Sequence, residues 1–106
     1  MTTFDEREKA FEAGFARSQE VEFKAAARRD RMVGLWAGEK LGLTGDALQD
    51  YALAVMRADL REPGDDDVLE KIVADFAENG VDILPSQVRA RMDAAFKAAK
   101  AEIVRG

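Results

Sequence analysis

The sequence predicts an all-α protein: a four-helix bundle with a long first helix whose N-terminal arm is partly free or disordered. No segment alternates between apolar and polar residues as a half-buried strand would. Alanine, leucine, glutamate, lysine and arginine dominate, and all of them favour helix. Strong stop signals at Gly42, Pro63, Gly64 and Gly80 divide the chain into four segments. Because the chain has 106 residues and no change of composition along its length, we expect a single domain, residues 1–106.

The first helix is expected to begin at Thr3, whose spacing to Glu6 matches the T-x-x-E capping box. There is no proline between Phe4 and Leu41, and the first strong stop is Gly42. An unbroken helix of this length spans roughly 55 to 60 Å at about 1.5 Å per residue. The helices that the rest of the chain can supply are only about half as long.

The second helix is predicted from Gly45 or Asp46 to about Arg61. Thr44 is its expected N-cap, and the sequence Glu-Pro-Gly at 62–64 ends it. Apolar residues recur every three or four positions, which predicts one buried stripe. The stripe consists of Leu48, Tyr51, Ala52, Val55, Met56 and Leu60.

The third helix is predicted from about Asp66 to Asn79, with Asp65 or Asp66 as its cap and Gly80 as its terminator. Pro85 and Ser86 are expected to open the fourth helix, because proline is favoured in a first helical turn. The buried stripe of the third helix is predicted to be Val68, Leu69, Ile72, Val73 and Phe76, and that of the fourth Val88, Met92, Ala95, Phe96, Ala99 and Ile103.

Gly34, Gly38 and Gly42 recur every fourth residue on one face of the first helix. Each interior glycine lowers helix stability by about 1 kcal/mol relative to alanine, so a compensating role is expected. One interpretation is the close approach of a neighbouring helix backbone. The other is a groove for a flat ligand beside Trp36. Both interpretations stay open at this point.

The three shorter helices can cover only about one half of the first helix. The C-terminal half is the better candidate, because its large apolar residues can anchor a bundle. These residues are Met32, Val33, Leu35 and Trp36. We therefore divide the domain into an arm, residues 1–19, and a helical bundle, residues 20–106.

Three phenylalanines, Phe4, Phe11 and Phe15, fall on one helical face of this otherwise charged arm. They could fold back onto the bundle as ordinary core. The length mismatch favours another role, in which the apolar face lies in the groove of a partner protein. Binding to a membrane interface is less favoured, since the polar face is not enriched in basic residues. Gly14 weakens the arm helix by about 1 kcal/mol, so we expect the free arm to fray or become disordered.

The charge balance excludes some classes of partner. A net charge of −5 and a pI near 4.8 argue against binding to nucleic acid, which needs a basic face. Residues 1–31 contain seven acidic and seven basic side chains, so the acidic excess lies in residues 32–106. There is no cysteine, no signal-like N-terminus and no apolar run that approaches the length of a membrane span.

Catalysis is also disfavoured. Without histidine or cysteine there is no imidazole base, no thiolate nucleophile and no zinc site of the usual ligands. Ser18 and Ser86 are the only serines, and neither lies in a G-x-S-x-G sequence. The run Asp65, Asp66 and Asp67 lacks the alternating ligands of a calcium loop, so we interpret it as capping and expect no metal site.

Several segments together resemble the zeta subunit of the alphaproteobacterial ATP synthase, and the resemblance covers essentially the whole chain. The most specific part is F-K-A-x-A-R-R, residues 23–29, followed by G-L-W-A, residues 34–37. The remaining matches are Thr2, Thr3, Phe4, Asp5, Arg7 and Glu8 in the arm, and Glu39, Lys40, Leu41, Gly42, Leu43 and Gly45 at the first turn.

The resemblance implies a four-helix protein without enzymatic activity that inhibits ATP hydrolysis by the F1 sector. In that family the N-terminal segment is thought to insert between the catalytic alpha and beta subunits near gamma, which blocks rotation in the hydrolytic direction. The implied partners are the F1 alpha, beta and gamma subunits. The implied location is cytoplasmic, peripherally associated with the membrane-bound ATP synthase and without direct insertion into the membrane. We expect a monomer when the protein is free.

Two sets of site residues follow by position. The inhibitory arm would bind the partner through Phe4, Asp5, Arg7, Glu8, Phe11, Glu12 and Phe15. Some relatives are associated with nucleotides, which makes Gly34, Trp36 and Gly38 a second candidate site, for weak binding of ADP or ATP. No other cofactor is expected. The alternative function is therefore a nucleotide-sensing helical module that binds a small ligand.

Overall fold

The computed structural model describes the chain at residues 3–60 and 64–105, with side chains described from Ser18 onward. Four helices account for most of this part: α1 (Thr3–Lys40), α2 (Gly45–Ala58), α3 (Asp66–Glu78) and α4 (Pro85–Arg105). No strand occurs within the described residues. The prediction of an all-α protein with four helices and a long first helix is therefore confirmed.

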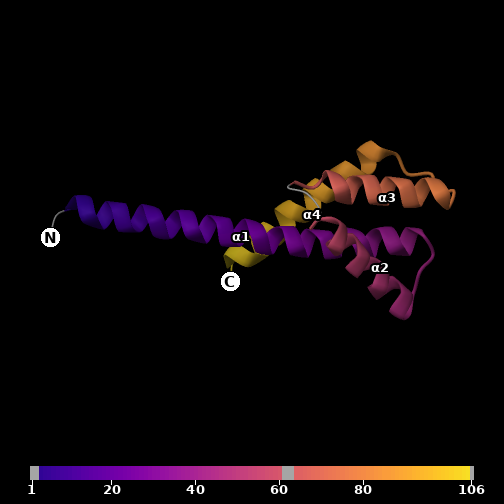
Figure 1. Ribbon diagram of the computed structural model, residues 1–106, viewed down its shortest axis with the longest axis horizontal. Helices are drawn as coiled ribbons and strands as arrows, with labels where there is room; N and C mark the ends of the chain where they lie inside the picture. Colours follow the sequence, from indigo (N-terminus) through magenta and orange to yellow (C-terminus); the bar gives the residue numbers. More distant parts are fainter. Residues whose placement is uncertain (1–2, 61–63, 106) are drawn as a thin grey trace.

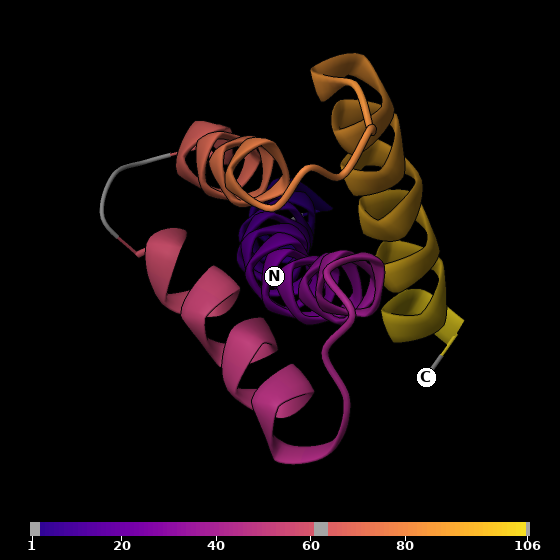
Figure 2. The same cartoon turned by 90° about the vertical axis from the view of Figure 1, so that its right-hand side faces the viewer.

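The long helix α1 is the central element of the bundle. Figure 2 shows α2, α3 and α4 arranged around it, and α1 contacts all three. In the described part of the chain, α2 and α4 do not contact each other. The molecule measures 64 × 24 × 21 Å along its principal axes (Figure 1). Its length follows from α1, whose 38 residues exceed the 14, 13 and 21 of α2, α3 and α4.

The helix ends follow the predicted stop signals closely. Gly42 has φ +85°, and the amide of Leu43 donates to the carbonyl of Gly38 at 2.9 Å, which is a Schellman ending. The same ending closes α3, where Gly80 has φ +67° and the amide of Val81 donates to the carbonyl of Phe76 at 2.9 Å. These backbone conformations are the ones that glycine adopts without strain.

The start of α4 at Pro85 is also confirmed. There the side chain of Gln87 accepts a hydrogen bond from the amide of Leu84 at 2.7 Å. Thr44 and Asp65 occupy the N-cap positions of α2 and α3 as predicted, but neither side chain makes a capping hydrogen bond. The capping interpretation of Asp65 is therefore wrong for its side chain, which instead forms ion pairs with Arg29 and Arg89.

The predicted end of α2 is too late. The helix stops at Ala58, and Asp59 is its C-cap, while Arg61 lies outside the described residues. The carboxylate of Asp59 faces Arg29 on α1, at 3.4 Å, which ties down the chain where it leaves the helix. Leu60 follows in a turn and is 80% exposed, so its predicted burial is wrong.

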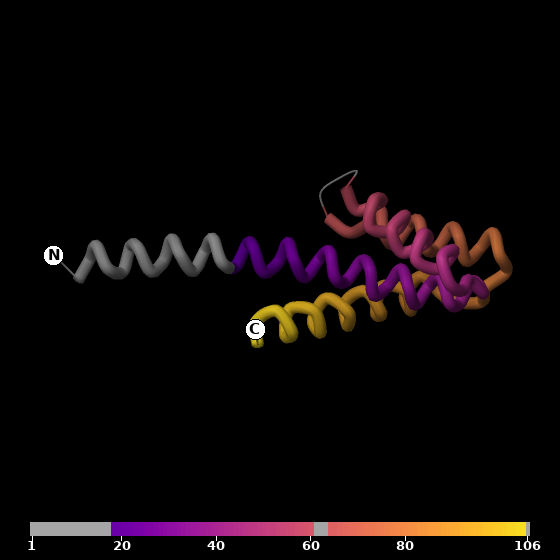
Figure 3. The backbone as a smooth tube through the Cα atoms, turned by 90° about the horizontal axis from the view of Figure 1, so that it is seen from below, coloured from indigo at the N-terminus to yellow at the C-terminus, as the bar shows by residue number. Residues whose placement is uncertain are grey.

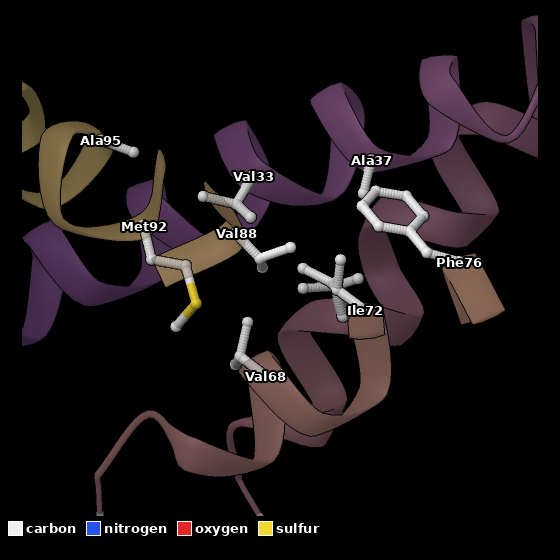
Figure 4. Close-up of a cluster of buried hydrophobic side chains, with 9 residues drawn as sticks. Val33, Ala37, Val68, Ile72, Phe76, Val88, Met92 and Ala95 are labelled. Carbon is white, nitrogen blue, oxygen red and sulfur yellow. The ribbon is translucent and has the colours of Figure 1, made fainter. Parts of the chain in front are cut away.

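The core lies between α1, α3 and α4 and is closed by α2. Figure 4 shows Val33 and Ala37 of α1 facing Ile72 and Phe76 of α3. The ring of Trp36 meets Phe76 edge to face, with centroids 5.8 Å apart. The fully packed set is Val33, Ala37, Val55, Val68, Ile72, Phe76, Val88, Met92 and Ala95. Of the four predicted anchors on α1, Val33 is buried, Leu35 and Trp36 are half-buried, and Met32 is exposed.

The glycines of α1 allow α2 to come close. A Cβ atom at Gly34 would lie 2.9 Å from the Cα of Ala52, and one at Gly38 would lie 2.5 Å from a methyl group of Leu48. Both glycines are buried. The first interpretation of the glycine spacing, close approach of a neighbouring helix backbone, is confirmed at Gly34. At Gly38 the neighbours are side chains of α2, and nothing lies within 4 Å of a Cβ atom at Gly42, so the interpretation does not hold for those two glycines.

Within the part of the chain that the structure describes, no helix is long and apolar enough to cross a membrane.

Candidate functional site

The bundle ends at a definite point on α1. Among the described residues, the interhelical ion pair closest to the start of α1 joins Lys100 Nζ of α4 to Glu22 Oε1, at 3.8 Å. Six residues further along, Arg28 pairs with Glu102 at 3.4 Å. Residues 18–20 are exposed, and among the described side chains Glu20 forms an ion pair within α1, with Lys24 at 3.0 Å. Since α1 begins at Thr3, the interhelical ion pairs of the described side chains start well inside the helix, at Glu22.

This boundary agrees with the predicted length mismatch. Figure 3 shows the C-terminal end of α4 beside α1, close to where the coloured part of the α1 tube begins. The predicted partner-binding residues all lie before this point, and their side chains lie outside the described residues. They are Phe4, Asp5, Arg7, Glu8, Phe11, Glu12 and Phe15. Their role stays a prediction.

The second predicted site is divided between two faces of α1. Gly34 and Gly38 lie against α2, where Ala52, Val55, Leu48 and Tyr51 fill the space beside them. Trp36 instead borders a surface hollow between α1 and α4, with a volume of about 540 Å³. The three residues therefore do not line one groove.

The hollow at Trp36 has a composition that could hold an anion. It is lined by Trp36, Lys40, Ile83, Gln87, Ala90, Arg91 and Ala94. The guanidinium carbon of Arg91 lies 5.0 Å from the centre of the Trp36 ring, which is a cation–π contact. Two cations beside an aromatic ring are suited to a small anionic ligand.

The most constrained polar site is one that sequence reasoning missed. Arg29 of α1 is only 7% exposed, and its neighbour Asp30 only 2%. The guanidinium donates to Asp30 at 3.0 Å, and to Asp59 and Asp65 at 3.4 Å each. Asp65 is paired in turn with Arg89 of α4 at 2.8 Å. We call these five residues, Arg29, Asp30, Asp59, Asp65 and Arg89, the Arg29 cluster.

The Arg29 cluster connects all four helices. Asp30 belongs to α1 and Arg89 to α4. Asp59 occupies the C-cap position of α2, and Asp65 occupies the N-cap position of α3. The guanidinium of Arg29 also lies 5.4 Å from the centre of the Phe96 ring on α4. Replacing one partner of such a buried pair leaves an uncompensated charge, which is strongly destabilising. The cluster therefore fixes where α1 lies relative to the other helices.

Two carboxyl groups of the cluster, those of Asp30 and Asp65, differ in their proton affinity. Burial, together with a hydrogen bond to Asp59, raises the pKa of Asp30 to about 8, although the charge of Arg29 opposes this. Burial alone would also raise the pKa of Asp65, but its hydrogen bond to Arg89 and the charges of Arg89 and Arg29 hold that pKa below its usual value. Asp65 therefore keeps its charge near neutral pH, whereas Asp30 keeps its proton.

A sequence signal for Arg29 existed. It precedes the buried Val33 by four residues, and so lies on the core-facing stripe of α1. However, three arginines close together, at positions 28, 29 and 31, are typical of a solvated charged face. Its partners Asp59 and Asp65 are 30 and 36 residues away in the sequence, which no local pattern connects.

The aspartate run at the start of α3 serves the fold. Asp65 and Asp66 both pair with Arg89, the latter at 3.1 Å. Asp66 and Asp67 lie in the first turn of α3, where negative charge interacts favourably with the helix dipole. Among the described residues no group of three or more acidic side chains is arranged to hold a metal ion.

A small all-α body with a long central helix and several interhelical ion pairs is typical of a helical interaction protein. The family comparison agrees with this class. The sequence model of ATPase inhibitor subunit zeta matches residues 1–102. The chain therefore belongs to the ATPase inhibitor subunit zeta family, and the resemblance noted in the sequence is confirmed. No curated protein matches the chain. The family is named for a regulatory role, inhibition of an ATPase.

Proposed function

We propose that this protein inhibits ATP hydrolysis by the F1 sector of ATP synthase by inserting its N-terminal arm, residues 1–19, at the interface of the alpha and beta subunits near gamma. The inserted helix blocks rotation in the hydrolytic direction. The protein itself catalyses nothing, and it is held at the membrane-bound enzyme only through its partner subunits. Membership of the inhibitor family supports the general role.

The observation that carries the mechanism is the mismatch between α1 and its partners. α1 has 38 residues, but the interhelical ion pairs of the described chain begin at Glu22. In this proposal the arm of α1 serves to bind a partner protein and not to build the bundle. On docking, the phenylalanines of the arm enter an apolar groove, while Asp5, Arg7, Glu8 and Glu12 pair with charges at its rim. The ordering of the arm opposes binding by about 2 to 5 kcal/mol.

The substitution Phe11→Ala tests the proposed mechanism. Loss of a buried aromatic anchor weakens binding by about 1 to 3 kcal/mol, which is roughly tenfold or more in the concentration needed for half-inhibition. The measurement is ATP hydrolysis by the cognate F1 sector at increasing concentrations of inhibitor.

Phe23→Ala is the matched control, because it makes the same change on the same helix outside the arm. Phe23 is 75% exposed, so its removal leaves the bundle intact. Inhibition should stay as in the unchanged protein. If Phe11→Ala inhibits as well as Phe23→Ala, the insertion mechanism is wrong.

A second candidate function, nucleotide sensing, is favoured by the hollow at Trp36. Lys40 and Arg91 could hold phosphate groups there, and Trp36 could contact the base. Titration with ADP should then change the fluorescence of Trp36 in a saturable way, and Arg91→Ala should weaken this response. A signal that never saturates would exclude the sensing function at this hollow.

A further inference from the structure

The Arg29 cluster contains more negative than positive groups in a space that water scarcely reaches. Three carboxyl groups, those of Asp30, Asp59 and Asp65, surround the single guanidinium of Arg29. The side chains of Arg29, Asp30 and Asp59 are only 8%, 3% and 17% exposed. Arg89 compensates one carboxylate, Asp65. One negative charge is therefore left over, and a buried excess charge is avoided by binding a proton.

The position of that proton follows from the contacts. Asp65 has two cations beside it, Arg29 and Arg89, so it has no need of a proton. Asp30 and Asp59 both contact only Arg29 among the cations of the cluster. Their carboxyl oxygens reach the same nitrogen, Nη2 of Arg29, at 3.0 and 3.4 Å, so the two groups lie close together where one cation cannot balance two negative charges, and one proton removes the excess.

Charged groups from every neighbouring helix end face this pair. α1 supplies Arg29, the start of α3 supplies Asp65, and α4 supplies Arg89. Asp66 and Asp93 act only on Arg89, at the outer side of the cluster. Lys100 lies 5.5 Å from the ring centre of Phe96, the same ring that Arg29 contacts at 5.4 Å.

We propose that Asp30 and Asp59 share one proton that holds α1 against the end of α2, and that release of this proton in mildly alkaline solution loosens this contact. The cluster is thus a pH-sensitive latch between α1 and the α2–α3 connection. The pKa of about 8 at Asp30 agrees with this charge count. Because the two groups are coupled, the proton belongs to the pair and not to either residue alone.

The latch has a defined effect on stability. The unfolded chain loses the proton near the ordinary carboxyl pKa of about 4. The folded pair keeps it up to about pH 8. Between these values the folded state binds more protons than the unfolded state, so stability is highest at the acidic end and declines as pH rises. The unfolding equilibrium constant increases by at most about tenfold per pH unit, and the decline ends above about pH 8.

The direct test is an NMR titration of the aspartate side-chain carboxyl carbons in the unchanged protein between pH 3 and pH 10. The carboxyl carbon of Asp30 should shift in a step with its midpoint in the range of about 7 to 9, well above the usual carboxyl value of about 4. Complete titration of Asp30 below about pH 5 would overturn the proposal.

A variant test uses Asp30→Asn, which has the shape of the protonated group and no proton to lose. Its stability in urea should show almost none of the decline between pH 5 and pH 8. Asp66→Asn is the matched control, because it makes the same change of charge at a residue that is 86% exposed and also paired with Arg89. That control should keep the decline. An equal pH dependence in both variants would contradict the latch.

Discussion

The two ends of the bundle hold α1 to its neighbours in opposite ways. Near its C-terminus, Val33, Trp36 and Ala37 pack in the apolar core that α1 shares with the other helices. Less than two turns earlier, Arg29 and Asp30 hold the same helix through buried ion pairs. Apolar packing is strong and tolerant of small shifts, whereas a buried ion cluster adds little net stability but accepts only one arrangement.

The apolar end and the charged end therefore have different roles: the first stabilises the fold, and the second fixes the position of α1. The apolar end supplies the free energy that keeps a 106-residue chain folded. The charged end lies between that core and Glu22, where the interhelical ion pairs of the described side chains begin. It therefore fixes the position of α1 next to the arm, the part that inserts into the partner in the proposed function. Substitutions at the two ends should differ in size and in their response to pH.

The largest effect is expected at the apolar end, from Phe76→Ala. Phe76 is 1% exposed and packs against Trp36, so the substitution leaves a cavity that the helices cannot fill. The free energy of unfolding should fall by about 3 to 5 kcal/mol, with little dependence on pH. Urea denaturation followed by circular dichroism measures this. Leu84→Ala, at a residue that is 59% exposed, should cost less than about 0.5 kcal/mol.

At the charged end, Arg29→Met should cost about 3 kcal/mol near neutral pH, because Asp59 and Asp65 lose the cation that faces them. The loss should become smaller as the pH falls below the usual carboxyl pKa of about 4, where carboxyl groups take up protons and no longer need a partner. The exposed neighbour offers a control: Arg28→Met removes only the pair with Glu102 and should cost less than about 1 kcal/mol. Equal losses for the two variants, or a loss at Arg29 that does not vary with pH, would contradict the assigned roles.

The contact between α1 and α2 should show the smallest effects. Gly34→Ala would place a Cβ atom 2.9 Å from the backbone of Ala52. The resulting overpacking of about 1 to 3 kcal/mol exceeds the gain in helix propensity of about 1 kcal/mol, so the variant should be less stable.

Gly38→Ala should be milder, because its Cβ meets the end of the flexible Leu48 side chain, which can move away. Thermal unfolding of the two variants checks this order. A Gly34→Ala protein more stable than Gly38→Ala would mean that α2 lies further from α1 than described.

The local signals in the sequence predicted the fold well. Gly42, Gly80 and Pro85 each specify a backbone conformation by their own chemistry, so the helix ends next to them could be found without the structure. The end of α2 could not be found in this way. It depends on Asp59, whose partner Arg29 lies 30 residues earlier and comes near only after folding.

The candidate sites also differ in whether local sequence was enough to predict them. The glycine pattern of α1 was a sound signal, but spacing alone could not distinguish a helix contact from a ligand groove. Only the positions of Ala52 and Leu48 decide between them. The Arg29 cluster was missed because three arginines close together in a charged segment suggest a solvated face. The greater length of α1 relative to the other three helices, in contrast, was predicted correctly, because the stop signals in the sequence were enough to predict it.

The central claim is that residues 1–19 inhibit and that the remainder is the body that carries them. Every interhelical ion pair of the described chain lies within residues 20–106, so this part retains the contacts that hold the bundle. The most direct measurement is ATP hydrolysis by the cognate F1 sector with the intact chain or with residues 1–19 deleted. The intact chain should inhibit, and the shortened chain should be folded by circular dichroism yet leave hydrolysis unchanged. Undiminished inhibition by the shortened chain would contradict the claim.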